Sequence, residues 1–482
     1  MHDAPPPPST AVERSPRPAG FDLLRIAPLR AVVRSPLFPY VLQLAVLAVY
    51  LVLAVFAWGR FAPEGVPAKQ YAQTNAVNLV IWGLWWPAMV WATVLLGRIW
   101  CAVCPLELVA NLAERAGRRV GLRQWVLGRW LRAGWLILAL FVVLQWLVPG
   151  AQLHRVPAYT SIFLWAALAA AAAVGFVYRD RAFCRGFCPV GLLLGVYGRG
   201  GMLAVRPNEG RVCDECPGHD CVQNCNRNRL DARSCPSLLN PAQLDRNNDC
   251  LVCGQCVKVC PPGNVGLYLR WPFSAADARD RRASWPVALF VIIVSGFVVS
   301  ELCSEWASAK AVFQWAPERV TAWLGAKPYA GWIEGAWTLG VVPLALWSAL
   351  VVAARLAGVR GNFAELLCQM ALPLSVLVAA GHLCKGMAKF NSWVGYVPLA
   401  TADPSGTETA LAITAKSLAK PASVLPMTDV SLTAAALVAL SAWLAYREFR
   451  LAGHPQPWRL LLPIGLLAGG FGFLVVGWGF LP

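Results

Sequence analysis

Cysteine spacing is the clearest chemical signal in this chain of 482 residues. Nine of its 16 cysteines lie between Cys213 and Cys260. The stretch CLVCGQCVKVCPP places Cys250, Cys253, Cys256 and Cys260 in the pattern C-x2-C-x2-C-x3-C-P, the spacing of bacterial ferredoxins. Three cysteines on such a tight loop can bind one [4Fe–4S] cluster, while the fourth is carried away by the turn before proline and reaches a second cluster. Zinc sites use similar cysteine pairs, but the intact run favours iron–sulfur chemistry.

The run implies a partner run, and the chain contains one. Cys213, Cys216 and Cys221 are its first three cysteines, with two extra residues before Cys221. We therefore expect one cluster on Cys213, Cys216, Cys221 and Cys260, and a second on Cys250, Cys253, Cys256 and either Cys225 or Cys235. Cys225 has the three-residue spacing, whereas Cys235 has the following proline. We favour Cys225, because spacing limits the reach of a ligand and proline only shapes the turn.

Two more cysteine pairs follow apolar stretches, and each is closed by a proline. Cys101 and Cys104 precede Pro105, and Cys184 and Cys188 precede Pro189 in the stretch CRGFCPVG. Four thiolates at one membrane depth could bind a further metal centre or form a dithiol–disulfide couple. A cysteine near a helix end can also be a small packing residue. Because both pairs share the proline and the position, we predict that the four thiols converge as one redox-active group.

The elements that carry these cysteines are membrane helices. The chain is 57% hydrophobic and only 14% charged, against about 25% charged residues in soluble domains. Nine apolar stretches are near the length that crosses a bilayer: 39–58, 75–97, 133–149, 160–178, 284–303, 334–354, 363–384, 430–446 and 460–481. With the N-terminus inside, most of the 42 lysines and arginines fall on the cytoplasmic side, as the positive-inside rule requires. A nucleic-acid partner is disfavoured, because these basic residues lie at membrane borders.

We therefore predict an α-helical polytopic membrane protein of about nine transmembrane helices, with a cytoplasmic two-cluster ferredoxin-like module between spans four and five. The predicted parts are a disordered cytoplasmic N-terminus (1–38), a four-helix membrane domain with both cysteine–proline motifs (39–198), the module (199–283) and a five-helix membrane domain (284–482). The C-terminus falls outside. The reducing cytoplasm argues against a disulfide framework in the module.

The second half of the chain adds ionisable and soft groups at the outer ends of two spans. These are Glu301, Cys303, His382, Cys384 and Met387. Glu301 and His382 could accept protons from a quinol, whereas the thiols, His382 and Met387 could bind copper. A disulfide between Cys303 and Cys384 is a third alternative, and ordinary border residues are a fourth.

The motifs resemble those of the NapH/NosR group of membrane-bound polyferredoxins and of the CcoG type. CRGFCPVG at Cys184–Cys188 matches their membrane motif, and CLVCGQCVKVCP matches their ferredoxin run. The resemblance covers roughly residues 75–265. It implies helices with cysteine–proline motifs beside a cytoplasmic two-cluster module. Cys101 and Cys104 are one residue closer than the motif requires, and the C-terminal half matches no assigned part.

The function that we predict is iron–sulfur electron transfer in the bacterial inner membrane. Single electrons would pass between a membrane quinol pool or an outer-face partner and a cytoplasmic-face partner, with two [4Fe–4S] clusters, a candidate further metal centre and a candidate quinone as cofactors. The bilayer and other respiratory or redox proteins are the expected partners. Copper reduction or maturation for a respiratory oxidase or reductase is one alternative, and a redox-sensing regulatory protein is another.

Overall fold

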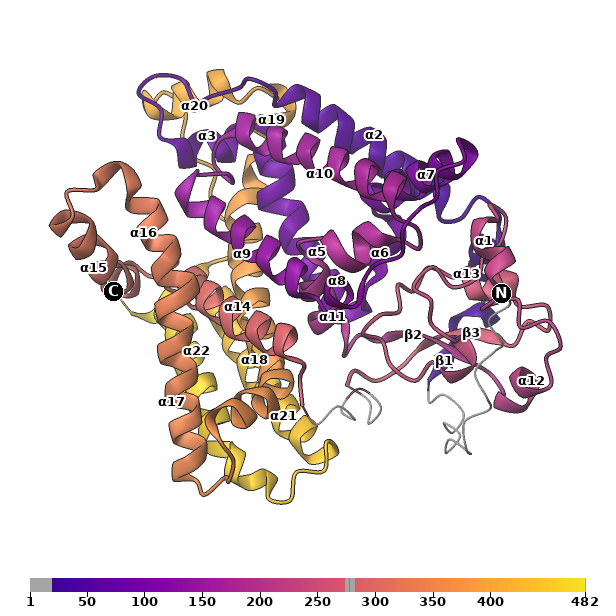
Figure 1. Ribbon diagram of the computed structural model, residues 1–482. Helices are drawn as coiled ribbons and strands as arrows, with labels where there is room; N and C mark the ends of the chain where they lie inside the picture. The colour runs from indigo at the N-terminus through magenta and orange to yellow at the C-terminus, as the bar shows by residue number, and fades with distance from the viewer. Residues whose placement is uncertain (1–19, 274–276, 278–281, 482) are drawn as a thin grey trace.

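The computed structural model describes residues 20–273, Asp277 and 282–481, and the fold is mostly helical (Figure 1). Within these residues, seven segments are long and apolar enough to cross a membrane: Ala76–Leu96, Pro157–Val177, Trp285–Cys303, Lys327–Leu356, Phe363–Ala402, Met427–Leu451 and Pro457–Phe480. Two shorter apolar helices, Tyr40–Phe56 and Trp135–Gly150, coincide with the first and third predicted spans. The helical membrane class is confirmed, and the count of nine spans stays a prediction.

The helices before the cysteine-rich stretch are interrupted where the cysteine–proline pairs lie. They are α2 (Tyr40–Phe56), α3 (Ala68–Thr74), α4 (Ala76–Asn78), the π-helical η2 (Leu79–Trp85), α5 (Trp86–Leu96), α6 (Ile99–Val103), α7 (Pro105–Arg119), α8 (Arg129–Arg132), α9 (Trp135–Gly150), α10 (Pro157–Val177), the π-helical η3 (Phe183–Phe187) and α11 (Gly191–Gly198). Cys104 and Cys188 both adopt extended backbone angles. A residue before proline is forced into that conformation, so each pair sits at a sharp turn between two helices.

The two turns lie side by side because their helices pack together. Gly175 of α10 touches α7 so closely that a Cβ atom would stand 2.2 Å from the carbonyl oxygen of Ala110. Ala110, Ala171 and Phe183 are buried in the same small cluster, against which Cys184 and Cys188 pack. A side chain larger than hydrogen at position 175 would push the second cysteine pair away from the first.

The cysteine-rich segment is built on a small antiparallel sheet, which lies to one side of the helices in Figure 1. The strand order is β1 (Phe21–Asp22), β3 (Val265–Leu269) and β2 (Leu203–Pro207). In the register, Phe21 and Leu203 both pair with Leu269. The other elements are α12 (Gly210–Asp214), η4 (Asn224–Asn228), η5 (Pro241–Gln243) and α13 (Gln255–Val259). These short elements leave most of the cysteines on loops around the sheet.

The N-terminal segment is folded where the sequence predicts disorder. Residues 1–19 lie outside the described residues, but from Phe21 the chain forms β1, η1 (Leu23–Arg25) and α1 (Ala27–Arg34). Leu24 and Val33 are buried in the same cluster as Cys250 and Cys256. The prediction of disorder for 1–38 is therefore wrong from Phe21 onward. Apolar side chains of this segment pack into a core that is formed mainly by the distant Cys250 loop and the sheet.

The helices after the module form the rest of the body. They are α14 (Trp285–Cys303), α15 (Ala307–Trp323), η6 (Lys327–Tyr329), α16 (Ala330–Ala336), the π-helical η7 (Trp337–Val341), α17 (Val342–Leu356), α18 (Phe363–Trp393), η8 (Val394–Tyr396), α19 (Val397–Ala402), α20 (Thr407–Thr414), α21 (Met427–Leu451), η9 (Pro457–Leu460) and α22 (Leu461–Phe480). α18 is almost wholly buried. One core cluster joins Met89 and Leu193 of the first half to Leu374 and Phe471 of the second. The two predicted membrane domains thus share one core.

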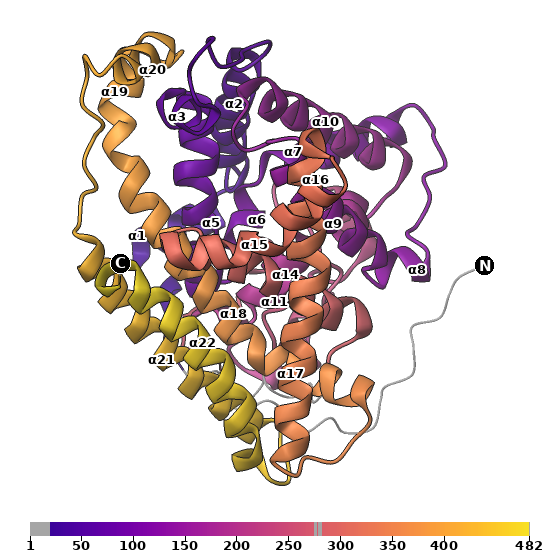
Figure 2. The same ribbon diagram turned by 90° about the vertical axis from the view of Figure 1, so that its left-hand side faces the viewer.

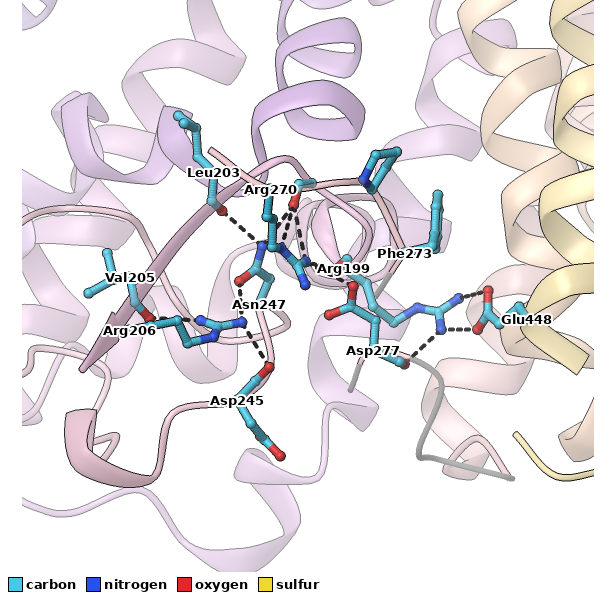
Figure 3. A network of polar contacts seen from close by, with 12 residues as sticks. Arg199, Leu203, Val205, Arg206, Asp245, Asn247, Arg270, Phe273, Asp277 and Glu448 are labelled. Carbon is cyan, nitrogen blue, oxygen red and sulfur yellow. Dashed lines mark hydrogen bonds and ion pairs between the residues drawn. The ribbon is translucent and has the colours of Figure 1, made fainter. Parts of the chain in front are cut away.

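Long-range contacts fix both ends of this body. Away from the sheet, α20 lies against α3 (Figures 1 and 2), where Gln70 Nε2 donates to the carbonyl oxygen of Ala410 at 2.8 Å. Near the sheet, Arg199 is buried between three helical segments. Its Nη2 donates to Glu448 Oε2 at 2.9 Å (Figure 3). The same nitrogen donates to the Leu372 carbonyl oxygen at 2.8 Å. In the same network Asn247 Nδ2 donates to the Leu203 carbonyl oxygen at 2.9 Å. The cysteine-bearing loops are therefore attached to the helical body by buried polar contacts.

Candidate functional site

The first group of thiols contains Cys213, Cys216, Cys221 and Cys260. Burial, together with the neighbouring thiols of Cys260 and Cys213, raises the pKa of Cys221 to about 11. Burial also raises the pKa of Cys213, while a hydrogen bond from Asn264 Nδ2 to its Sγ, 3.2 Å long, lowers it. Cys260 precedes Pro261 and is extended, so it leaves α13 toward the first run rather than toward its own. Cys260 therefore lies near Cys213 and Cys221, and the crossed ligand arrangement stays a prediction.

The second group contains Cys250, Cys253 and Cys256 on a loop that turns through two left-handed residues, Val252 and Gly254. Gly254 is required here, because its φ is +68° and a Cβ atom would lie 2.8 Å from the Val33 side chain. Burial raises the pKa of Cys250 to about 12 and raises that of Cys256 well above its ordinary value. The loop therefore keeps its thiols in a dry environment under α1.

Cys235 joins this second group, and Cys225 does not. The Cys235 thiol is close enough to raise the pKa of Cys256, second only to burial, and it raises the pKa of Cys253 as well. Its backbone N–H donates to the carbonyl oxygen of Cys221 at 2.9 Å, which holds it beside the groups. Cys225 is exposed on η4. This arrangement does not support our preference for Cys225, because loop closure brings the more distant cysteine to the site.

The cysteine–proline pairs form a third group, Cys101, Cys104, Cys184 and Cys188, which we call the thiol quartet. Burial raises the pKa of Cys104 well above its ordinary value, and the thiols of Cys184 and Cys101 raise it further. Burial raises the pKa of Cys188 to about 12, and the same two thiols add to the rise. The four thiols therefore lie near enough to influence one another, although they come from segments some eighty residues apart.

Two arginines beside the quartet were missed in the sequence. Arg98 interacts with the thiol of Cys101, and Arg181 with that of Cys184. Each stands three residues before the first cysteine of its pair, so the repeated pattern R-x2-C was a signal that could have been found. Both arginines are buried. Among the described residues, no group of three or more His, Cys, Asp or Glu side chains is arranged so that it could hold a metal ion, so these groupings rest on burial and mutual electrostatic influence.

A cavity of about 40 Å³ lies between α5, α9, α14 and α18. It is lined by Trp82, Trp86, Pro87, Gln145, Val148, His154, Phe297, Glu301, His382, Lys385, Gly386 and Lys389. Lys385 Nζ lies 3.3 Å from Glu301 Oε2 and 2.6 Å from Glu305 Oε1. The volume suits a few water molecules and is far below that of a usual ligand pocket. Glu301 and His382, which the sequence proposed for proton exchange, thus meet at one polar cavity.

The soft groups of the second half do not meet there. Cys384 points to α21, with its Sγ 3.5 Å from the carbonyl oxygen of Ala434. His382, two residues away on α18, faces the other side. All 16 cysteines are described and are free thiols. Neither the copper set nor the disulfide between Cys303 and Cys384 is supported by this arrangement, because residues two apart on a helix point to different faces.

Aromatic rings connect the cavity with the thiol quartet. The Trp86 ring lines the cavity. Its centroid lies 6.3 Å from that of the His382 ring and 6.2 Å from that of the Trp85 ring. Trp85 in turn lies 5.1 Å from Trp100, the residue before Cys101. On the other side, the hydroxyl of Tyr197 is 3.4 Å from His382 Nδ1, and Tyr197 belongs to α11, which follows the second cysteine pair. Both cysteine–proline segments therefore reach the cavity wall.

Comparison with known proteins matches the cysteine–proline segments to a 4Fe-4S binding domain. A family of 4Fe-4S binding domains matches residues 78–123 and 161–207, the segments that carry the quartet. The chain is 28% identical over 180 residues to the ferredoxin-type protein NapH of Haemophilus influenzae and 28% identical over 189 residues to NapH of Escherichia coli. It is 26% identical over 169 residues to the methylamine utilization ferredoxin-type protein MauN of Paracoccus denitrificans. No solved structure matches the chain.

The matches are partial in both directions. They cover 35%, 37% and 33% of this chain and 61%, 64% and 56% of the three relatives, respectively. The fold and the matches together indicate a mostly helical membrane protein with a 4Fe-4S binding domain, similar in part to ferredoxin-type proteins. More specifically, they confirm the resemblance to the NapH-type membrane polyferredoxins that the motifs predicted.

Proposed function

We propose that this protein carries single electrons between a quinol at the membrane and a redox protein that docks at the cysteine-rich module. The observation that carries the proposal is the sequence of neighbouring groups described above: the polar cavity, the tryptophan row, the thiol quartet and the two thiol groups of the module. A [4Fe–4S] cluster, when bound, supplies one-electron chemistry with little rearrangement of its ligands.

The residues fit such clusters by the chemistry of their donors. We assign one cluster to Cys213, Cys216, Cys221 and Cys260, and a second to Cys250, Cys253, Cys256 and Cys235. The quartet is the candidate for a further centre. Its support is the mutual electrostatic influence of the buried thiols and the unpaired buried arginine nitrogens beside them: within the described residues, Arg98 Nε and Arg181 Nη2 have no hydrogen-bond acceptor. Buried donors without acceptors are costly, and an anionic group among the thiols would satisfy them.

At the other end, Glu301 and His382 would take the protons that leave a quinol together with its electrons. The cavity is too small for the ring, so the headgroup would stand at the cavity mouth, where the Glu301 side chain is 30% exposed. Water inside the cavity would pass protons among Glu301, His382 and the lysines. The electrons would tunnel toward the quartet across the packed rings of His382, Trp86 and Trp85, which are not themselves reduced.

The orientation follows from charge. We propose that the module faces the cytoplasm of a bacterial inner membrane, with the N-terminus inside and the C-terminus outside, because most basic residues then lie inside. A reporter fused after Gly210 should report a cytoplasmic position, and one fused at the C-terminus an external one. An external position of Gly210 would overturn both the orientation and the argument from a reducing compartment.

The function is tested with protein purified anaerobically in detergent. Iron and acid-labile sulfide should be present, and added decylubiquinol should produce the EPR signals of reduced clusters. In Glu301→Gln the same signals should develop at least tenfold more slowly, while Glu318→Gln, a matched change on the exposed face of α15, should leave the rate unchanged. Stoichiometric zinc without labile sulfide would exclude the proposal, and equal rates in both variants would remove Glu301 from it.

A further inference from the structure

Three charged side chains are buried between the thiol quartet and the module. Glu107, Arg181 and Arg233 are 2%, 6% and 4% exposed. Glu107 Oε1 lies 2.8 Å from Arg233 Nη2 and 3.3 Å from Arg181 Nε. One carboxylate oxygen thus holds two guanidinium groups. We call these three residues the charge bridge.

Each member of the bridge stands next to cysteines already assigned to the site. Glu107 follows Cys104 by three residues, Arg181 precedes Cys184 by three, and Arg233 precedes Cys235 by two. Two members therefore come from the two halves of the quartet, and the third comes from the module. The bridge is the place where the three chain segments meet.

The surroundings hold the bridge in one geometry. Gln43 of α2 donates from Nε2 to Glu107 Oε2 at 2.7 Å and to the Ala102 carbonyl oxygen at 3.0 Å. The backbone N–H of Arg233 donates to Gln255 Oε1 of α13 at 3.3 Å. Glu107 is ionised in this setting: burial alone would raise its pKa, but Arg233 and Arg181 lower it. Because the three side chains are buried and hydrogen-bonded, the positions of their charges are fixed within the protein.

The charges do not cancel within the bridge. Two guanidinium groups face one carboxylate, which leaves a net positive charge in a dry interior, where an uncompensated charge is expensive. Arg181 Nη1 donates to Ser237 Oγ at 3.2 Å, a neutral acceptor that leaves the charge uncompensated. The nearby thiols also act on the arginines: Arg181 is influenced by Cys184, Cys101 and Cys253, and Arg233 by Tyr40 and Cys253. Among the described residues, Arg181 Nη2 and Arg233 Nε have no hydrogen-bond acceptor. In a purely structural ion pair the charges would cancel and every donor would have an acceptor. Here one positive charge is left over, and two N–H donors remain for anionic groups on either side.

We propose that the charge bridge of Glu107, Arg181 and Arg233 sets and couples the reduction potentials of the iron–sulfur groups bound by the quartet and by the Cys250, Cys253, Cys256 and Cys235 thiols. The inference rests on the proposed function. Reduction adds one negative charge to a group, and a fixed positive charge a few ångströms away stabilises that state. Glu107 pairs with both arginines and offsets part of their positive charge. Removing its negative charge should therefore change the reduction potentials on both sides of the bridge.

The experiment is an EPR-monitored redox titration of the full chain, purified anaerobically. Glu107→Gln removes the negative charge and should raise both midpoint potentials, by about tenfold in the ratio of reduced to oxidised form, which is about 59 mV for a one-electron couple. Arg233→Gln should lower mainly the potential on the module side, and Arg181→Gln mainly that of the quartet. Arg227→Gln is the matched control, because Arg227 pairs with Asp180 at 2.9 Å in the same region but is partly exposed. Its potentials should equal those of the unmodified protein.

A conservative pair separates charge from folding. Arg233→Lys keeps the charge and should keep the potential near that of the unmodified protein, whereas Arg233→Gln should shift it. Equal potentials in the unmodified protein, Glu107→Gln and Arg233→Gln would overturn the bridge while leaving the proposed function intact. Equal shifts in Arg233→Lys and Arg233→Gln would also overturn it, since the charge would then not be the cause. If the unmodified protein held no labile sulfide, the proposed function itself would be refuted, and the bridge with it.

Discussion

The fourth ligand of the second thiol group can be decided by two single substitutions. Serine has nearly the shape of cysteine but a far less acidic hydroxyl, so it removes a thiolate ligand with little change in packing. Because Cys235 lies among Cys250, Cys253 and Cys256, Cys235→Ser should leave that cluster with three thiolates and cause its loss. Cys225→Ser changes an exposed residue and should be close to neutral.

The size of the loss depends on how many centres are present. With two clusters in the module and an empty quartet, Cys235→Ser should remove about half of the acid-labile sulfide per polypeptide; with a third cluster in the quartet, the loss should be about one third. The assay is iron and sulfide analysis with EPR on anaerobically purified protein, normalised to polypeptide. A loss in Cys225→Ser with none in Cys235→Ser would refute the structural assignment, and a loss in both would show that the two thiol groups are wrongly separated.

Three further predictions concern the quartet, the aromatic row and the helical body. The double substitution of Cys184 and Cys188 by serine should leave both module clusters intact, remove any metal beyond them and abolish electron transfer from quinol to an acceptor dye; full transfer in this variant would make the pairs packing residues. Trp85→Leu should slow cluster reduction by decylubiquinol in stopped-flow absorbance without changing the iron content, and an unchanged rate would exclude the tryptophan row as the route. Arg199→Ala leaves Glu448 buried and unpaired, so it should cost about 3–5 kcal/mol, measurable as a lower unfolding midpoint in detergent; a midpoint equal to that of the unmodified protein would contradict the buried pair.

Local chemistry could be predicted from the sequence wherever the acting residues are close along the chain. The run Cys250, Cys253, Cys256 and Cys260 carries its own geometry, because the loop length and the following proline decide where each thiol can point. The membrane character was equally accessible, since about twenty apolar residues in a row have few other stable environments. The convergence of the two cysteine–proline pairs was predicted from their shared position at helix ends, and the mutual influence of the buried thiols agrees with it.

Residues that act together from distant segments were not predictable in the same way. Cys225 has the better spacing, yet the closed loop brings Cys235 to the site, because backbone pairing with Cys221 decides the path of the chain. The segment after Phe21 looked disordered because its few apolar residues suffice only when the sheet and the Cys250 loop supply the rest of a core.

By itself, the sequence indicated the cofactor class and the membrane environment and predicted a set of cysteine ligands, because these depend on residue type and short spacing. Only the tertiary structure placed Cys235 near Cys253 and Cys256, brought Glu301 and His382 to one cavity, and paired Glu107 with Arg181 and Arg233. The physical reason is that burial is a property of the folded chain. A charged group or a thiolate has a high free energy only when packing by distant segments removes it from water, and the sequence does not show which groups are buried in this way.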